Sequence, residues 1–190
     1  LGYLLVLIIY LSSFLEEADK FEPELEDFKK SDREDPTEEE LELIMEQTSY
    51  LYDVYLRKQQ LQALTEMKII YYFKSLEILL KKILEVTYDS KEASKIFGWD
   101  DIKSGFKEEG IFISKIDGYN ETVELKNVNN NLKHSSKIHS SVKASKEFHD
   151  MTFFKFEELS KFYRRVKLPV KSFFDSLSMK LVNDVVSAGT

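Results

Sequence analysis

The chain contains no cysteine and very little glycine or proline, with 6 and 3 of these among its 190 residues. The lack of thiols excludes a disulfide scaffold, a cysteine-containing zinc site and a cysteine nucleophile. It is compatible with a reducing cytoplasm, where we expect the protein to act. So few turn residues disfavour a β-sandwich or a β-barrel. By contrast, 43% of the residues are hydrophobic, including 14 phenylalanines and 10 tyrosines, which predicts a folded domain with a sizeable core.

Charge is unevenly distributed along the chain, whose formal net charge is −7. The stretch from Glu16 to Asp53 holds 16 acidic and 4 basic residues, whereas Val123 to Asn183 holds 12 basic and 6 acidic residues. A basic C-terminal half can attract a polyanion, which the acidic N-terminal half would repel. The alternative is that both stretches are ordinary solvated helix faces.

The N-terminal segment is strongly apolar. Leu1 to Leu11 reads LGYLLVLIIYL, which is shorter than the roughly 20 residues that span a bilayer. No basic residue precedes it and no small-residue cleavage site follows it, so it fits a signal peptide poorly. We expect a helix over Leu4 to Phe28 that packs in a core or a dimer interface, with a clipped membrane anchor as the minor alternative. Residues 1–35 are therefore predicted to pack on, or extend, a helical domain formed by residues 36–190.

Helical periodicity dominates the rest of the sequence. Apolar residues at spacings of three and four follow Pro36 as far as Leu84, which predicts either one helix of about 50 residues or two with a bend near Gln60. Four further helices and two loops are expected. The helices are Asp101 to Glu109 with Gly110 as its stop, Asn120 to His134 capped by Asn120, Thr152 to Val166 ending before Pro169, and Val170 to Val186. The loops are an extended segment, Ile111 to Ile116, and a polar one, Ser135 to Ser145. The fold class is thus all-α, a single-domain helical bundle with a long N-terminal helical extension.

The most unusual segment is Glu124 to Ser136, ELKNVNNNLKHSS, because asparagine is a poor helix former. Its apolar residues form the expected buried stripe: Leu125, Val128 and Leu132. Polar residues at the same spacings form a second stripe: Asn127, Asn130 and His134. Lys126 and Lys133, seven residues apart, share a third line. Such a surface suits a phosphate or a base edge, although the amides can equally cross-link helices.

The six residues from Asn129 to His134 resemble the Arg-Asn-x-x-x-His motif of the HEPN superfamily, the higher eukaryote and prokaryote nucleotide-binding domains. The segment Tyr71 to Leu84 also looks like the long helix before that motif, with Glu77 and Lys81 as a supporting acidic and basic pair. The likeness covers roughly Ile69 to Leu181. It implies an all-α bundle that often forms a homodimer, with two motif copies in one composite site. Many members are metal-independent ribonucleases of prokaryotic toxin–antitoxin and defence systems.

One departure from the motif is chemically important, since Asn129 replaces the arginine that holds the phosphate in the family's ribonucleases. Asparagine has no charge and cannot make the bidentate phosphate contact, although Lys126 and Lys133 can supply point charges nearby. The resemblance makes Asn130 and His134 the retained residues, with His134 in proton transfer. Two hypotheses follow. The chain is a metal-independent endoribonuclease, or it is a catalytically degenerate module that binds nucleotide, RNA or a protein partner such as a cognate antitoxin.

Other candidate sites are less well supported by the sequence. The histidines at 134, 139 and 149 lack the tight spacing of metal ligands, so we expect no metal and no cofactor. The serines near His134 lack a nucleophile elbow. Lys161, Arg164, Arg165 and Lys167, with Phe162 and Tyr163, form a basic and aromatic cluster typical of RNA binding. The alternative is a basic turn that complements the dipole at a helix C-terminus.

Overall fold

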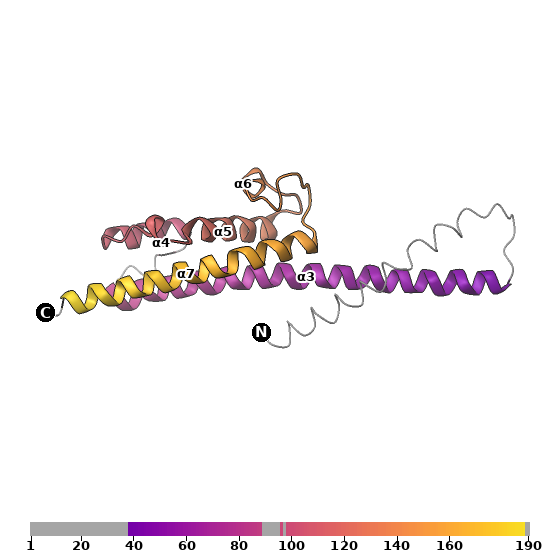
Figure 1. Ribbon diagram of the computed structural model, residues 1–190, viewed down its shortest axis with the longest axis horizontal. Helices are drawn as coiled ribbons and strands as arrows, with labels where there is room; N and C mark the ends of the chain where they lie inside the picture. Colours follow the sequence, from indigo (N-terminus) through magenta and orange to yellow (C-terminus); the bar gives the residue numbers. More distant parts are fainter. Residues whose placement is uncertain (1–37, 89–95, 97, 189–190) are drawn as a thin grey trace. The chain divides into compact units, whose positions relative to one another are not determined.

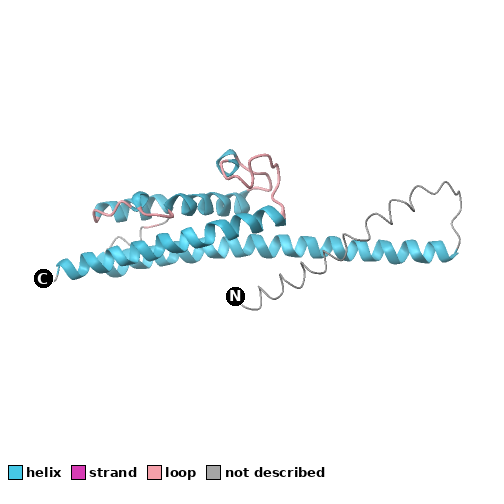
Figure 2. Ribbon diagram, in the orientation of Figure 1, coloured by secondary structure: helices cyan, strands magenta, loops and turns pink. Residues whose placement is uncertain are grey.

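The fold is all-α, as the periodicity predicts. The structure, a computed structural model, describes residues 38–88, 96 and 98–188. It contains five α-helices and one 3₁₀ turn within those residues (Figure 1): α3 Glu38–Tyr88, α4 Trp99–Glu108, η2 Ile113–Lys115, α5 Tyr119–His134, α6 Ser140–Lys143 and α7 Phe156–Ala188. Figure 2 shows helices and loops in this described part and no strand. The predicted helix over Leu4 to Phe28 and the predicted segment 1–35 lie outside the described residues.

The chain divides into two compact units, Leu1–Thr65 and Glu66–Thr190. The division falls inside α3, whose 51 residues form one continuous helix. The prediction of one helix of about 50 residues is therefore confirmed, and the helix has no break near Gln60. In the first unit, Val54 and Leu61 are buried while most other described side chains are exposed.

The second unit has a continuous apolar core. Helix α5 lies along α7, and aromatic side chains join them to the neighbouring elements (Figure 1). Trp99 at the start of α4 contacts both Phe73 and Tyr119, with ring centroids 6.1 and 6.2 Å apart. Phe148 contacts Phe154 and Phe162 at 5.2 and 5.3 Å. These contacts join α3, α4 and the start of α5, and they join the segment after α6 to α7.

Helix α7 runs through Pro169, so the predicted break before this residue is wrong. Proline inside a helix removes one backbone hydrogen bond and costs about 3 kcal/mol. Here the buried face continues across it without a change of spacing, through Leu159, Phe162, Val166, Val170, Phe173 and Leu177. The hydroxyl of Tyr72 also donates a hydrogen bond of 2.9 Å to the carbonyl of Lys167 on the same turn. Tertiary packing therefore outweighs the local cost of the proline.

The start of α5 also differs from the prediction, because Gly118 rather than Asn120 is its N-cap. Gly118 has φ +84°, a conformation that favours glycine, and its carbonyl accepts hydrogen bonds from the backbone N–H and the hydroxyl of Thr122. A Cβ at Gly118 would lie 2.8 Å from the carbonyl carbon of Pro169 and closer still to its oxygen. The chain enters α5 through this close approach to α7, which local capping preference cannot reveal.

The remaining connections are more structured than predicted. The segment Ile111 to Ile116 contains the turn η2 instead of being extended, and both Ile111 and Ile113 are buried. The polar loop Ser135 to Ser145 contains α6 and an isolated bridge between Lys137 and Phe153. Gly110 ends α4 with φ +76°, as expected of a helix stop. None of the described helices is long and apolar enough to cross a bilayer.

Candidate functional site

The asparagines of α5 separate into buried and exposed side chains. Leu125 and Val128 are buried on the predicted apolar stripe, and two asparagines, Asn129 and Asn131, are buried beside them. Asn130 and His134 are exposed on the predicted polar stripe. The asparagines of this segment therefore have two different environments: Asn129 and Asn131 lie in the interior, whereas Asn130 faces solvent.

Asn131 fastens the chain that follows α5. Its Nδ2 donates to the carbonyls of Ser135 at 3.3 Å and Lys137 at 2.8 Å, and its Oδ1 accepts from the backbone N–H of His139 at 2.7 Å. All three partners are backbone groups of the loop, so one buried side chain takes the place of the missing secondary structure there. Asn131 has the cross-linking role that the sequence left open for these amides.

We expect Asn131→Ala to lower the free energy of unfolding by about 2 kcal/mol, because it removes three hydrogen bonds that a buried side chain makes to the backbone. The change also removes order from residues 135–139, which the three hydrogen bonds now hold. Urea unfolding followed by circular dichroism measures the loss. The matched control is Asn127→Ala on the same helix, which is expected to stay within about 0.5 kcal/mol of the wild type. Equal losses in the two variants would contradict the fastening role.

Asn129, at the position of the motif arginine, is fully buried. Its Nδ2 donates to Oδ1 of Asn130 at 3.0 Å, and its Oδ1 has no hydrogen-bond partner among the described residues. A neutral, buried carboxamide cannot hold a solvent-borne phosphate as a guanidinium does. The structure thus brings Asn129 and Asn130 together, but it directs Asn129 into the interior.

His134 is the last residue of α5 and is exposed, next to the exposed Lys133. It lies five residues after Asn129, which places the two about 140° apart around the helix. No hydrogen bond between described residues orients the imidazole of His134 or joins it to Asn129 or Asn130. Lys126, on the preceding turns of α5, is half-buried. The residues that the motif groups together do not converge on one point within a single chain.

Arg165 is held by two carboxylates. Its guanidinium donates to both oxygens of Glu147, at 2.7 and 2.9 Å, and to Oε2 of Glu124 at 2.6 Å. The hydroxyl of Ser145 donates to the same Glu124 oxygen at 2.7 Å. These contacts connect three parts of the chain: helix α5, helix α7, and the segment that follows α6. The donors of Arg165 are therefore taken by carboxylates of the protein, whereas its neighbour Arg164 donates only to the carbonyl of Ser160 among the described residues.

The charges of this cluster are strongly coupled. Burial raises the pKa of Glu147, but the hydrogen bonds from Arg165, a backbone hydrogen bond and the charges of Arg165 and Lys146 together outweigh burial and hold the pKa below its ordinary value. In turn, the hydrogen bond to Glu147 and the charge of Glu124 raise the pKa of Arg165. The Glu147 side chain is only 6% exposed, so the arginine neutralises a carboxylate that has little contact with water. The cluster is a structural tie between three parts of the second unit.

Glu77 and Lys81 form the predicted ion pair, with 3.2 Å between Lys81 Nζ and Glu77 Oε1. Lys74 lies on the other side of the carboxylate at 3.1 Å. Burial raises the pKa of Glu77, while the two lysines together lower it below its ordinary value. Pairs at these spacings each stabilise a helix by about 0.2–0.5 kcal/mol. The pair supports α3 itself, and no described contact links it to the asparagine segment.

The basic residues of α7 lie in the middle of a helix. Because α7 continues to Ala188, the dipole of a helix C-terminus does not account for Arg164 and Lys167. Phe162 and Tyr163 are both buried, so the aromatic half of the predicted cluster belongs to the core and cannot stack on bases. Lys161 makes an ion pair with Glu158 at 2.8 Å. Arg164 and Lys167 are exposed, and neither makes an ion pair with another described residue.

Lys68 of α3 completes a group of three cations that we call the basic cluster: Lys68, Arg164 and Lys167. Its Nζ lies 4.2 Å from the centroid of the Tyr163 ring, a cation–π contact between α3 and α7. Burial lowers the pKa of Lys68, and the positive charges of Lys167 and Arg164 lower it further. Sequence analysis missed Lys68, because only folding brings it to residues almost 100 positions away.

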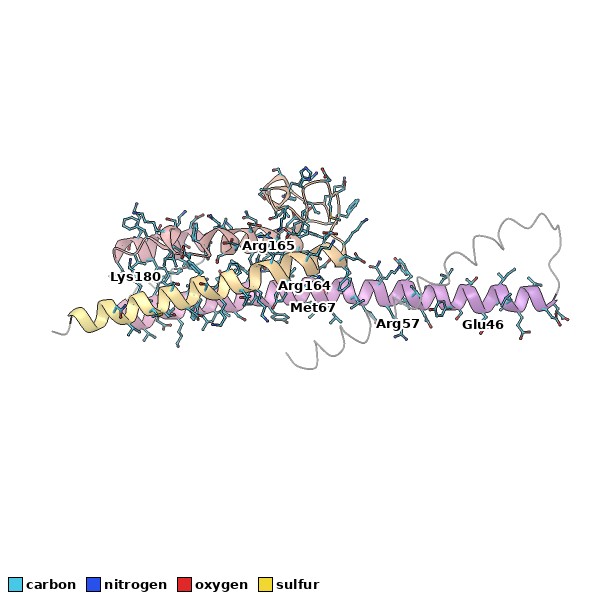
Figure 3. All side chains as sticks on the ribbon, in the orientation of Figure 1. Glu46, Arg57, Met67, Arg164, Arg165 and Lys180 are labelled. Carbon is cyan, nitrogen blue, oxygen red and sulfur yellow. The ribbon has the colours of Figure 1, made fainter. Side chains whose placement is uncertain are left out.

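An open depression of about 460 Å³ adjoins the basic cluster. Four cationic and two acidic side chains line it: Lys146, Glu147, Glu158, Lys161, Arg164 and Arg165. Two of these cations are matched by the two carboxylates, Lys161 by Glu158 and Arg165 by Glu147. A positive excess therefore remains at Lys146 and Arg164, the latter projecting from α7 next to Arg165 (Figure 3).

The chain matches no protein-family model, no curated protein and no solved structure. Among the described residues, no group of three or more histidine or carboxylate side chains is arranged to hold a metal ion.

Proposed function

We propose that this protein is a HEPN-like helical module that binds RNA through the basic cluster and does not cleave it. The observation that carries the proposal is the gathering of Lys68, Arg164 and Lys167 without a carboxylate partner among the described residues. Like charges brought together repel, and the charges of Lys167 and Arg164 add to burial, the larger cause, in lowering the pKa of Lys68. A phosphate at this place relieves it, and the backbone of RNA offers phosphates in series.

The interior position of Asn129 supports a binding role over catalysis. Stabilising the charge that develops on a phosphate needs a preorganised cationic donor, and a buried carboxamide bonded to Asn130 is not one. A general acid or base also needs an orienting partner, and no described residue orients His134. Members of the family that the motif resembles serve prokaryotic toxin–antitoxin and defence systems, so the proposal includes a role of this kind beside a protein partner such as a cognate antitoxin.

Reversing the charge of Arg164 is expected to weaken RNA binding about tenfold, because it replaces an attraction to phosphate with a repulsion. Fluorescence anisotropy with a labelled RNA of about 20 nucleotides measures the affinity. The matched control is Lys180→Glu, the same change of charge at another exposed position of α7 (Figure 3). It is expected to change the affinity less than threefold. Equal effects of Arg164→Glu and Lys180→Glu would mean that only the net charge matters and would overturn the site.

Incubation of the same RNA in EDTA tests the second half of the proposal. Wild-type protein and His134→Ala are expected to leave the RNA intact to the same extent and to bind it equally well. Cleavage by the wild type alone, with cyclic-phosphate ends, would instead establish a metal-independent ribonuclease that acts through His134. Lys126 and Lys133 would then be the cations to replace next.

A further inference from the structure

Helix α3 has an acidic and apolar face in the first compact unit. From Glu38 to Asp53 the sequence has six acidic residues and no basic one. Exposed apolar side chains lie at 41, 45 and 52, and an acidic residue directly follows each: Leu41 and Glu42, Met45 and Glu46, Tyr52 and Asp53. Spacings of four and seven put each set along one line of the helix. Met45 is 71% exposed and Tyr52 is 61% exposed, so no other described residue covers this face.

Helix α7 has a face of the opposite charge in the second compact unit. Arg164, Lys167 and Lys171 are exposed along it, and Lys171 makes an ion pair with Asp175. Apolar side chains are exposed on the same side of the helix: Leu168 at 70%, Met179 at 69% and Val182 at 61%. Positions 164, 168, 171 and 182 fall within about 60° of one another around the helix. Exposed large apolar groups rimmed by charge are typical of a surface that binds another protein.

We infer that the acidic face of α3 in one molecule binds the basic face of α7 in a second copy of the same chain. The two faces combine opposite charge with exposed apolar side chains of similar size. The acidic face extends over about 22 Å of helix from Glu38 to Asp53, and the basic face over about 27 Å from Arg164 to Val182. A repulsive contact results from pairing either face with itself, since the acidic face carries no cation between Glu38 and Asp53. This self-association is distinct from the composite motif site that the family resemblance implies.

The contact also regulates the proposed RNA site, because both ligands need Arg164 and Lys167. An acidic helix that covers these cations competes with phosphate for them, so RNA binding and self-association exclude each other. This competition rests on the proposed function, whereas the self-association rests only on the two faces.

Charge-swap variants of the full chain test the inference by sedimentation velocity in low salt. The first variant carries Glu42→Lys and Glu46→Lys, and the second carries Arg164→Glu and Lys167→Glu. All four positions are exposed, so both variants are expected to fold, with helical circular dichroism equal to that of the wild type. The wild type is expected to sediment above its monomer mass of 22.3 kDa and to dissociate in about 0.5 M salt.

Each variant alone is expected to be monomeric, with a dissociation constant raised about 100-fold by like charges across the contact. The equimolar mixture is expected to associate again, because the native α7 face of the first variant meets the native α3 face of the second, and the two altered faces are also opposite in charge. Only a direct contact between the two faces gives this rescue. A monomeric wild type, unchanged association of either variant, or failure of the mixture to associate would overturn the inference.

Titration with RNA separates this inference from the proposed function. Addition of RNA to the wild type is expected to convert the associated species into RNA-bound monomers. If the wild type associates but binds no RNA, the proposed function fails and the contact between copies stands. If it binds RNA and stays associated, the competition is wrong even though RNA binding is real.

Discussion

Gly118→Ala is expected to lower the free energy of unfolding by about 3 kcal/mol or more. Two costs add at this position. A residue with a side chain pays about 1–2 kcal/mol for the left-handed conformation at φ +84°. The new Cβ also collides with the carbonyl group of Pro169 and approaches Cβ of Phe173 to 3.1 Å. Because backbone and core atoms surround it, α5 and α7 must separate.

The control for this prediction is Gly110→Ala. Gly110 has a similar φ of +76°, but no atom lies within 4 Å of its Cβ position. Only the conformational cost applies there, so a loss of about 1 kcal/mol is expected. Chemical unfolding of both variants, followed by circular dichroism, isolates the close approach between α5 and α7 as the difference. Losses of the same size at Gly110 and Gly118 would show that the approach contributes nothing.

Arg165→Met is expected to destabilise the protein by about 2–4 kcal/mol, because it leaves the nearly buried carboxylate of Glu147 without its partner. Glu124 loses two hydrogen bonds in the same step but is more exposed and keeps the hydroxyl of Ser145. Methionine retains most of the apolar length of arginine, so the loss reports the guanidinium. For a chain of this size, the midpoint of thermal unfolding should fall by about 5–10 °C.

Arg164→Met is the matched control, one position earlier on the same helix. Its side chain is exposed and its one described hydrogen bond runs to the carbonyl of Ser160 on its own helix. The unfolding midpoint of this variant should stay within about 2 °C of the wild type. The RNA affinities should show the opposite order, since Arg164 belongs to the basic cluster and Arg165 does not. An unfolding midpoint that Arg165→Met leaves unchanged would contradict the structural role of the ion pairs that Arg165 makes with Glu147 and Glu124.

Periodicity predicted the helices well, because each long helix has a buried stripe that the sequence displays. The errors occur where tertiary contacts override local preferences. Pro169 was expected to end a helix, yet the apolar face continues across it and packing maintains the helix. Asn120 was expected to cap α5, yet the approach of the chain to Pro169 selects Gly118. Neither outcome is encoded within a few residues of its position.

The candidate site was predictable only in part, for the same reason. Spacing correctly separated an exposed polar stripe with Asn130 and His134 from the apolar stripe of α5. It did not show that Asn129 faces the interior, because asparagine is mostly exposed in folded proteins. Arg164 and Arg165 are adjacent and chemically identical. What distinguishes them is the arrival of Glu124 and Glu147 from other elements at one side of α7.

The salt dependence of RNA affinity tests the central claim most directly, because it counts the phosphates that the protein neutralises. The measurement compares the wild type with a double variant, Arg164→Ala and Lys167→Ala, between about 50 and 300 mM salt. Loss of two phosphate contacts to a single strand should reduce the slope of log affinity against log salt by about 1.4. A double variant with weaker binding and this smaller slope is the predicted result. An unchanged slope would show that RNA does not bind at the basic cluster.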